Sequence, residues 1–209
     1  MADPPARQAV KLAIGPFNVA GQAYQWAEAT RTFLGIEALS FAGSRAQARR
    51  LDGPSHTRVL HHRVRPAILK QLALERALNE VTHLLVESFT SLRGDQRMET
   101  LPTDLSWLRS RGIRMGAVFH GSDIRSPGDH LKRNANSYFN LIADQQVASI
   151  ERSTASLRAA ATGSGLPLFV STPDLLLDLP AATWLPLVID VHTWETSVPA
   201  LSSDRIRVL

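Results

Sequence analysis

The stretch Arg114-Met-Gly-Ala-Val-Phe-His-Gly-Ser-Asp-Ile-Arg-Ser-Pro127 decides the fold of this chain. Its first part is a short apolar run, residues 115–119, which passes without a break into the polar residues at 120–123. A continuous apolar run of this length is typical of a strand that is buried on both faces of a parallel sheet. In such sheets the carboxyl ends of the strands open onto the ligand crevice. The sequence therefore places an imidazole, a glycine and a carboxylate at the edge where an open α/β fold carries out its chemistry.

Strand-like apolar runs alternate with longer helical patterns along the rest of the chain. The strand-like runs are residues 11–17, 37–41, 58–62, 82–88, 115–119, 168–171 and 183–189. The helical patterns are 21–34, 66–80, 104–111 and 141–161, with a short helix between the last two strands and a predicted loop at 127–140. This alternation predicts an α/β, Rossmann-like domain, with an open, mainly parallel sheet and helices on both faces.

The composition is that of a soluble globular protein. The chain has 209 residues, of which 44% are hydrophobic and 20% charged, both ordinary values. It contains no cysteine, which excludes a disulfide framework, a thiolate nucleophile and a zinc–thiolate site. The net charge of +4 is spread over interleaved acidic and basic residues, so we expect no nucleic-acid partner, while peripheral contact with an acidic membrane surface stays open.

The two ends of the chain suggest its location and domain organisation. The N-terminus lacks the charged-then-apolar pattern of an export signal, and no apolar span is long enough for a membrane helix, which predicts a cytoplasmic protein. Residues 1–190 are predicted to form the Rossmann-like domain. Residues 191–209 read as a linker and, at 205–209, the first strand of a missing C-terminal domain. An apolar surface bared by that missing domain would also permit a homodimer.

Three segments carry a family resemblance. They are Gly15-Pro-Phe-Asn-Val-Ala-Gly21, Phe119-His-Gly-Ser-Asp-Ile-Arg125, and Val170-Ser-Thr-Pro-Asp-Leu-Leu176 with the following Ala182-Thr-Trp-Leu-Pro186 and Asp190. Together they resemble the N-terminal domain of bacterial, family 4-like glycosyltransferases of the GT-B fold. The likeness covers residues 11–190. The chain departs from that family at Leu187-Val-Ile-Asp190, where the family often carries Asn-Pro-x-Asp.

The resemblance implies an activity for the complete enzyme. Such an enzyme transfers a hexose from a nucleotide-diphosphate sugar to an acceptor, which is a glycan, a lipid or a small molecule. This half would bind the sugar acceptor, while the missing C-terminal domain would bind the nucleotide sugar, and the fragment alone should be inactive. The family needs no metal or other cofactor. The alternative is a stand-alone carbohydrate-binding or docking module without catalytic activity.

His120, Gly121 and Asp123 are the sharpest candidate site residues. By resemblance, His120 would be the catalytic residue that orients the transferred sugar, and a neutral imidazole offers one donor and one acceptor to a hydroxyl group. It could instead close the end of the sheet through backbone bonds. Gly121 permits either a turn with positive φ or a close approach of the backbone to a ligand. Asp123 would accept hydrogen bonds from the acceptor or cap the following segment.

Asn18, Gly21 and Glu87 are further candidates for substrate binding. The loop from 15 to 21 leads into a helix, whose free N–H groups favour anions, so Asn18 and Gly21 would contact the acceptor or the donor diphosphate. The loop lacks the G-x-G-x-x-G pattern of a dinucleotide site, and a tight strand-to-helix turn is the alternative. Glu87 ends the strand at 82–88, and a buried carboxylate is costly unless paired. We therefore expect Glu87 to reach solvent in the crevice or to meet an arginine.

Three remaining patterns have ordinary explanations beside a functional one. Arg125 could hold a phosphate or carboxylate through its planar guanidinium, or form a surface ion pair. The turn Ser171-Thr-Pro-Asp174 has the features of a helix start, with Thr172 as the N-cap. The adjacent His61 and His62 would point to opposite faces of a strand. We therefore expect no metal site.

Overall fold

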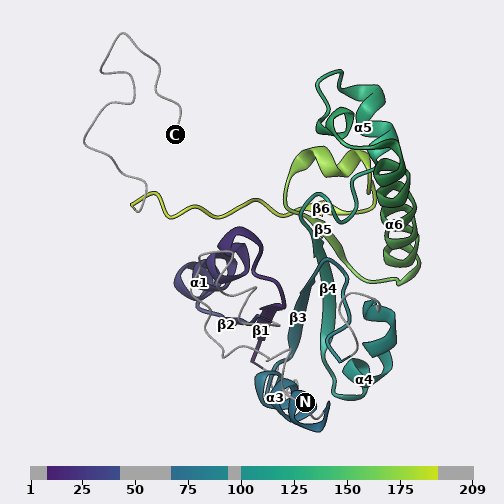
Figure 1. Cartoon of the computed structure of the whole chain (residues 1–209). Helices are drawn as coiled ribbons and strands as arrows, with labels where there is room; N and C mark the ends of the chain where they lie inside the picture. Colours follow the sequence, from purple (N-terminus) through teal and green to yellow (C-terminus); the bar gives the residue numbers. More distant parts are fainter. Residues whose placement is uncertain (1–8, 43–66, 94–99, 193–209) are drawn as a thin grey trace, which may run out of the picture.

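The computed structural model describes residues 9–42, 67–93 and 100–192 (Figure 1). The strands are β1 (Lys11–Gly15), β2 (Glu37–Ser40), β3 (His83–Glu87), β4 (Arg114–Phe119), β5 (Leu168–Val170) and β6 (Thr183–Trp184). The α-helices are α1 (Gln22–Leu34), α3 (Ala67–Ala77), α4 (Leu105–Ser110), α5 (Pro127–Arg133) and α6 (Asp144–Gly163). Short 3-10 helices are η1 (Val19–Gly21), η2 (Leu101–Asp104), η3 (Tyr138–Leu141) and η4 (Pro173–Leu177). The predicted strand at 58–62, both histidines in it, and the predicted C-terminal strand lie outside the described residues.

The described strands form one parallel sheet of six strands in the order β2-β1-β3-β4-β5-β6. This confirms the predicted α/β, Rossmann-like fold. The chain adds β2 on one side of β1 and then crosses to β3 on the other side, so the winding reverses between β1 and β3. Open α/β sheets bind ligands outside the carboxyl ends of their strands at such a switch point. The loops after β1, β3 and β4 occupy this position.

Helices cover both faces of the sheet, as predicted, because alternate residues of each strand point to opposite faces. Leu84 and Val86 of β3 face a core that includes Leu74 of α3, Leu108 of α4 and Ala161 of α6. On the other face, α1 buries an apolar stripe against the sheet. The members of this second cluster are Ile14, Ala23, Trp26, Ala27, Ala38 and Val118.

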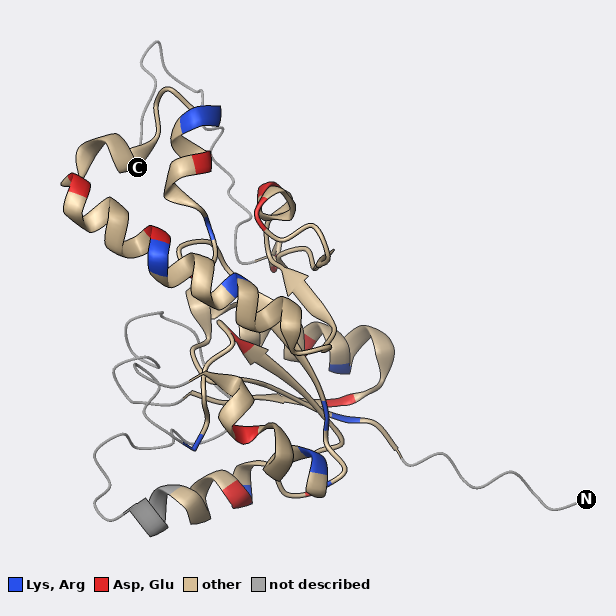
Figure 2. Ribbon diagram, turned by 90° about the vertical axis from the view of Figure 1, so that its right-hand side faces the viewer, with Lys and Arg blue, Asp and Glu red and all other residues tan. Residues whose placement is uncertain are grey.

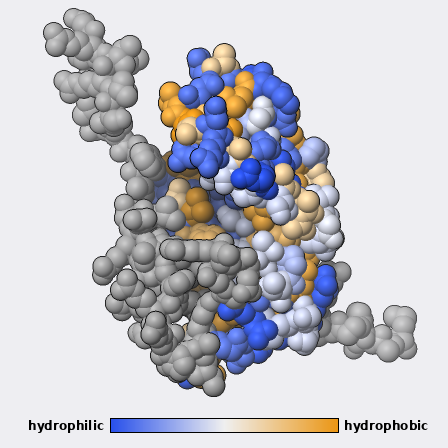
Figure 3. Space-filling view, turned by 45° about the vertical axis from the view of Figure 1, so that its right-hand side comes forward, coloured by the Kyte–Doolittle hydropathy of each residue, from blue (hydrophilic) through white to orange (hydrophobic). Residues whose placement is uncertain are grey.

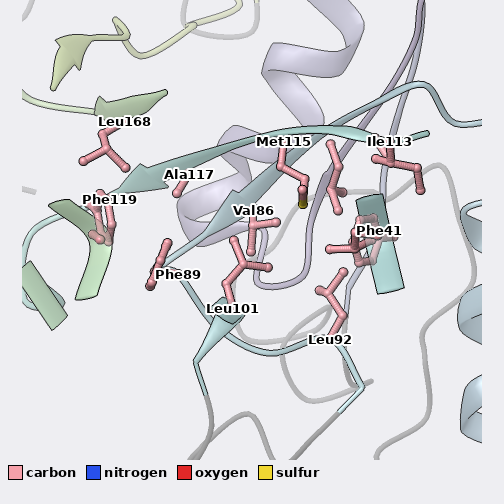
Figure 4. Close-up of a cluster of buried hydrophobic side chains, with 14 of the residues drawn as sticks. Phe41, Val86, Phe89, Leu92, Leu101, Ile113, Met115, Ala117, Phe119 and Leu168 are labelled. Carbon is pink, nitrogen blue, oxygen red and sulfur yellow. The ribbon is translucent and has the colours of Figure 1, made fainter. Parts of the chain in front are cut away.

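The larger core continues past the carboxyl edge of the sheet. Phe89 and Leu92, after β3, pack with Leu101 of η2 and with Phe119 at the end of β4 (Figure 4). The rings of Phe89 and Phe119 have their centroids 6.3 Å apart, and neither side chain is exposed. This packing fixes the backbone from which the loops after β3 and β4 start.

The predicted loop at 127–140 is wrong, because residues 127–133 form α5 and residues 138–141 form η3. Helix α5 begins with Ser126, whose hydroxyl accepts a hydrogen bond from the N–H of Asp129 at 3.1 Å, followed by Pro127 in the first turn. Ser at the N-cap and Pro at the first helical position are typical helix starts. The helix lacks apolar periodicity since it is short and carries several charged residues.

The last strand is shorter than predicted and ends at Trp184 instead of residue 189. Pro186 has no N–H to continue a ladder, and its carbonyl accepts a hydrogen bond from Trp26 Nε1 at 2.8 Å. The side-chain amide of Gln22 pairs with both backbone groups of Val188, at 3.1 and 2.9 Å. The chain after β6 therefore leaves the sheet and lies along α1.

We expect Gly15→Ala to lower the free energy of unfolding by about 2 kcal/mol, as overpacked cores do. A Cβ atom at Gly15 would lie 2.5 Å from the Phe41 carbonyl oxygen and 2.9 Å from its ring. The neighbouring Ile14 carbonyl accepts a hydrogen bond from the Phe41 N–H at 2.9 Å, which holds the two segments together. Urea unfolding measures the difference.

Gly163→Ala in α6 is the matched control, because in the described part of the chain no atom other than those of its chain neighbours and of the nearby helix backbone lies within 4 Å of the position of its Cβ. Replacing a helical glycine with alanine there should stabilise the protein by about 0.5 kcal/mol. If Gly15→Ala is as stable as the unsubstituted protein, then β1 can move away from residue 41, contrary to the close packing described above.

Candidate functional site

Four loops meet at the carboxyl edge of the sheet, around the switch point between β1 and β3. They are residues 16–21 after β1, 88–91 after β3, 120–126 after β4 and 171–172 after β5. The six candidate site residues predicted from the sequence all lie in these loops or, in the case of Glu87, directly before one. The parallel sheet brings them to one edge because its strands all end on the same side.

Glu87 is the central side chain of this edge, and it is completely buried. Its Oε2 atom accepts hydrogen bonds from the N–H groups of Phe17 and Asn18, at 2.7 and 2.6 Å, and its Oε1 atom accepts one from Val19 at 3.1 Å. The expectation that Glu87 reaches solvent or an arginine is wrong. Three backbone donors compensate its burial instead, and they bind the end of β3 to the loop after β1.

His120 lies beside Glu87 and is held between that carboxylate and an aromatic ring. Its Nε2 atom is 3.2 Å from Glu87 Oε1, which is an ion-pair distance without hydrogen-bond geometry. The indole ring of Trp26 in α1 stacks on the imidazole, with centroids 5.8 Å apart and planes inclined by 22°. The other ring nitrogen, Nδ1, has no hydrogen-bond partner among the described residues. This leaves Nδ1 as the atom that a ligand could contact.

Asn18 and Gly21 form the turn that joins β1 to α1. Asn18 is fully buried in the left-handed conformation with φ of 53°, and its Oδ1 atom accepts a hydrogen bond from the Tyr24 N–H at 3.0 Å. Its Nδ2 atom is buried without a partner in the described structure. Gly21 has φ of 74° and donates its N–H to the Asn18 carbonyl at 3.0 Å. Asn18 therefore lies next to Glu87, whereas the contacts of Gly21 are those of the turn.

Asp123 organises the loop after β4. Its carboxylate accepts hydrogen bonds from the N–H groups of His120, at 3.1 and 3.2 Å, and of Gly121, at 2.8 Å. It also accepts one from the Ser88 hydroxyl at 2.9 Å, which connects the loops after β3 and β4. Gly121 has φ of 144°, a conformation that favours glycine. Asp123 thus fixes the backbone on which His120 stands.

Arg125 and Asp174 form an ion pair between the loops after β4 and β5. Burial raises the pKa of Asp174, but the Thr172 hydroxyl and the Arg125 guanidinium lower it more, so the pKa lies below its usual value. Thr172 is the N-cap residue of η4, as predicted, but its hydroxyl makes no hydrogen bond with good geometry to this carboxylate or to the helix. The ion-pair interpretation of Arg125 is confirmed.

Buried polar atoms without a hydrogen-bond partner gather at this edge. In the described residues, such side-chain atoms are Asn18 Nδ2, His120 Nε2, Arg125 Nε and Thr172 Oγ1. They come from the loops after β1, β4 and β5, which are far apart in the sequence; β4 and β5 are neighbours in the sheet, and β3 separates β1 from them. Buried polar groups are normally satisfied, and each exception requires an explanation. The concentration of all four in neighbouring loops marks this edge as the candidate ligand site.

The far end of the loop after β4 is anchored to α6 by Glu151. The carboxylate accepts hydrogen bonds from the Ser126 hydroxyl, at 3.0 and 3.1 Å, and from the Gly128 N–H at 2.8 Å. Burial raises the pKa of Glu151, but these hydrogen bonds and Arg158 lower it more, so that the pKa lies below its usual value. Along α6 the acidic residues, Asp144 and Glu151, precede the basic ones, Arg152 and Arg158 (Figure 2).

A hollow of about 540 Å³ lies at the opposite, amino edge of the sheet, where β1 and β2 begin. The Lys11 ammonium contacts Glu37 at 2.8 Å and Glu80 at 3.1 Å, and these two hydrogen-bonded carboxylates raise the pKa of Lys11. Because Lys11, Glu37 and Glu80 pair with one another, these side chains offer a ligand less unsatisfied charge than the carboxyl edge offers unsatisfied polar atoms.

Apolar side chains are also exposed at the surface. Among them are Tyr138 and Leu141 of η3, and Figure 3 shows apolar surface in the upper part of the molecule.

Sequence reasoning missed contributions of three residues to the candidate site. Trp26 belongs to the apolar stripe of α1, and the helical spacing of that stripe carries no sign that the ring would stack on His120. Arg125 and Thr172 were expected to have ordinary structural roles, whereas each leaves one polar atom unsatisfied at the site.

The described residues hold neither a metal-binding cluster nor a helix that could span a membrane. No group of three or more His, Cys, Asp or Glu side chains there is arranged to hold a metal ion. None of the helices in that part of the chain is both long and apolar enough to cross a membrane. Comparisons of the chain with protein-family models, curated proteins and solved structures gave no significant match.

Proposed function

We propose that this domain binds a hydroxyl-bearing ligand at the carboxyl edge of its sheet, as the acceptor-binding half of a glycosyltransferase. The observation that carries the proposal is the set of buried polar atoms without a hydrogen-bond partner in the loops after β1, β4 and β5, which are Asn18 Nδ2, Arg125 Nε and Thr172 Oγ1, beside His120, whose Nε2 faces Glu87. A ligand with several hydroxyl groups satisfies such atoms, since each hydroxyl both donates and accepts. The family resemblance of the same loops adds the glycosyl-transfer chemistry.

The charges at this edge favour an uncharged ligand. The carboxylates of Glu87, Asp123 and Asp174 lie in or beside these loops, and Arg125 pairs with one of them. An anionic ligand would meet an excess of negative charge, and like charges in a partly buried site repel each other strongly. Sugar hydroxyls carry no charge and match both donors and acceptors.

The proposed role of each residue follows from its polar atoms that have no hydrogen-bond partner in the described structure. His120 Nδ1 is the proposed contact to a hydroxyl of the sugar that is transferred, with Glu87 and Trp26 holding the ring. The Asn18 amide donates to the acceptor from the loop after β1. Gly121 and Asp123 shape the backbone between them, and Arg125 with Thr172 extends the contact surface toward β5. Catalysis would need the donor-binding half as well.

Amide NMR titrations of the domain test this proposal. Neutral oligosaccharides should shift the signals of residues near Asn18, His120 and Asp123, and nucleotide sugars should produce a weaker response. His120→Ala should weaken glycan binding by about tenfold, which corresponds to the loss of a single good hydrogen bond. His83→Ala, at the first residue of β3 and therefore at the opposite edge of the sheet, is the control with the same substitution. Tight binding of nucleotides, or no response to any glycan or lipid acceptor, would overturn the proposal.

A further inference from the structure

The turn between β1 and α1 directs three successive N–H groups at one carboxylate. Phe17, Asn18 and Val19 donate to Glu87 over distances of 2.7, 2.6 and 3.1 Å. Successive backbone N–H groups that converge on one point form an anion-binding concavity. In this protein the anion is part of the chain itself, contributed by the neighbouring strand across the switch point.

This position is the one at which doubly wound α/β folds hold the phosphate of a nucleotide, at the N-terminal end of the first helix. We infer that Glu87 is an internal anion that fills the phosphate position, and that it makes the site selective for ligands with an uncharged group at this point. Glu87 is then a specificity-determining residue. The identity of the uncharged group as a sugar hydroxyl rests on the proposed function, whereas the exclusion of anions does not.

The exclusion has two physical causes. The N–H groups of residues 17–19 have no second hydrogen to offer an incoming phosphate, because each N–H already donates to Glu87. A phosphate would also approach a carboxylate that is fully buried and shielded by little water, where repulsion between like charges is strong. An acceptor with an uncharged group therefore fits this loop, and a donor diphosphate does not.

The test compares the unsubstituted domain with Glu87→Ala in titrations with inorganic phosphate and with acetate. In the unsubstituted domain, the amide signals of residues 17–19 should not respond to either anion. In Glu87→Ala the same signals should shift and saturate, with an affinity for phosphate that is at least about tenfold higher than that of the unsubstituted domain. The three N–H groups are then free, and an external anion replaces the missing carboxylate.

Asp104→Ala is the matched control, since Asp104 is another buried carboxylate that accepts hydrogen bonds from backbone N–H groups, those of Leu92 and Arg93. This variant removes a comparable buried charge but should leave the signals of residues 17–19 insensitive to anions. A saturable response of these signals in the unsubstituted domain would overturn the inference. So would a folded Glu87→Ala that binds neither anion there.

If Glu87→Ala does not fold in dilute buffer, its refolding is compared in acetate and in chloride at equal ionic strength. Acetate should promote refolding more than chloride, because its carboxylate reproduces the two oxygen atoms that accept the three hydrogen bonds from residues 17–19. Equal behaviour in the two salts would overturn the inference. The glycan titrations that test the proposed function use uncharged probes, whereas this test uses anions. A negative result in one set of titrations therefore does not affect the result of the other.

Discussion

Glu87→Gln should lower the free energy of unfolding by about 3 kcal/mol, because hydrogen bonds to a buried charged group contribute about 1.5–3 kcal/mol each. The substitution keeps the shape of the side chain but replaces one acceptor oxygen with an NH₂ group. That group would point its hydrogens at a backbone N–H that now donates to Glu87. At least one donor of residues 17–19 is left buried without a partner, and the loop after β1 loosens from β3.

Asp104→Asn provides the comparison, and chemical denaturation monitored by tryptophan fluorescence provides the measurement. Asp104 accepts hydrogen bonds from the Leu92 N–H at 2.6 Å, the Ser91 hydroxyl at 2.9 Å and the more distant Arg93 N–H at 3.4 Å. We expect Asp104→Asn to destabilise the protein by a similar or smaller amount. Only Glu87→Gln should also alter the amide signals of Asn18 and His120. Loss of stability below about 0.5 kcal/mol, the level of ordinary surface substitutions, would show that the three hydrogen bonds do not hold the edge together.

The strands of the sheet could be predicted from the sequence because their apolar runs are continuous. β3 and β4 are covered by helices on both faces, so the runs at 84–86 and 115–119 contain no polar residue to blur their limits. The carboxyl edge followed from the same reasoning, since a parallel sheet ends all its strands on one side. The order of the strands did not follow, because no residue pattern records which strands become neighbours.

The partners of the site residues were harder to predict for a physical reason. The carboxylate of Glu87 is compensated by backbone N–H groups, which every residue except proline possesses and which no residue type reveals. The expectation of an arginine partner was therefore wrong, because backbone N–H groups take the place of a charged side chain. Asp123 was expected to contact the acceptor or to cap the following segment, whereas its carboxylate accepts hydrogen bonds from the N–H groups of His120 and Gly121, which precede it. Short acidic side chains commonly bond backbone N–H groups close to them in sequence, but the sequence does not reveal which ones.

The sequence contains the start signal of helix α5, but the lack of apolar periodicity after it led to the prediction of a loop. Ser126 and Pro127 are a standard helix start, and Asp129 supplies the N–H that the Ser126 hydroxyl accepts. The loop prediction rested on the missing apolar periodicity, although a helix of 7 residues is too short to show a full apolar stripe. The consequence for the site is direct, because α5 and Glu151 fix the end of the loop that carries His120.

The largest loss of stability is expected for Phe119→Ala, at about 4 kcal/mol, the middle of the range for buried phenylalanine. Phe119 is fully buried at the last position of β4 and contacts Phe89 from the loop after β3. Its carbonyl also accepts a hydrogen bond from the Ser171 N–H at 2.9 Å. Removal of the ring leaves a cavity where three of the four loops begin. The total free energy of unfolding of a small domain is only about 5–15 kcal/mol. The variant should therefore unfold at a much lower urea concentration than the unsubstituted protein.

Phe33→Ala is the matched control, because Phe33 is 81% exposed on α1 and its loss should change stability by less than about 0.5 kcal/mol. Phe119→Leu, which keeps most of the apolar volume, should lie between the two, and nearer to the unsubstituted protein. The amide signals of His120 and Gly121 should change most in Phe119→Ala, since those residues follow the cavity directly. Equal effects of Phe119→Ala and Phe33→Ala would mean that the core beneath the site contributes little to its stability, and that the loops are held instead by the hydrogen bonds of Glu87 and Asp123.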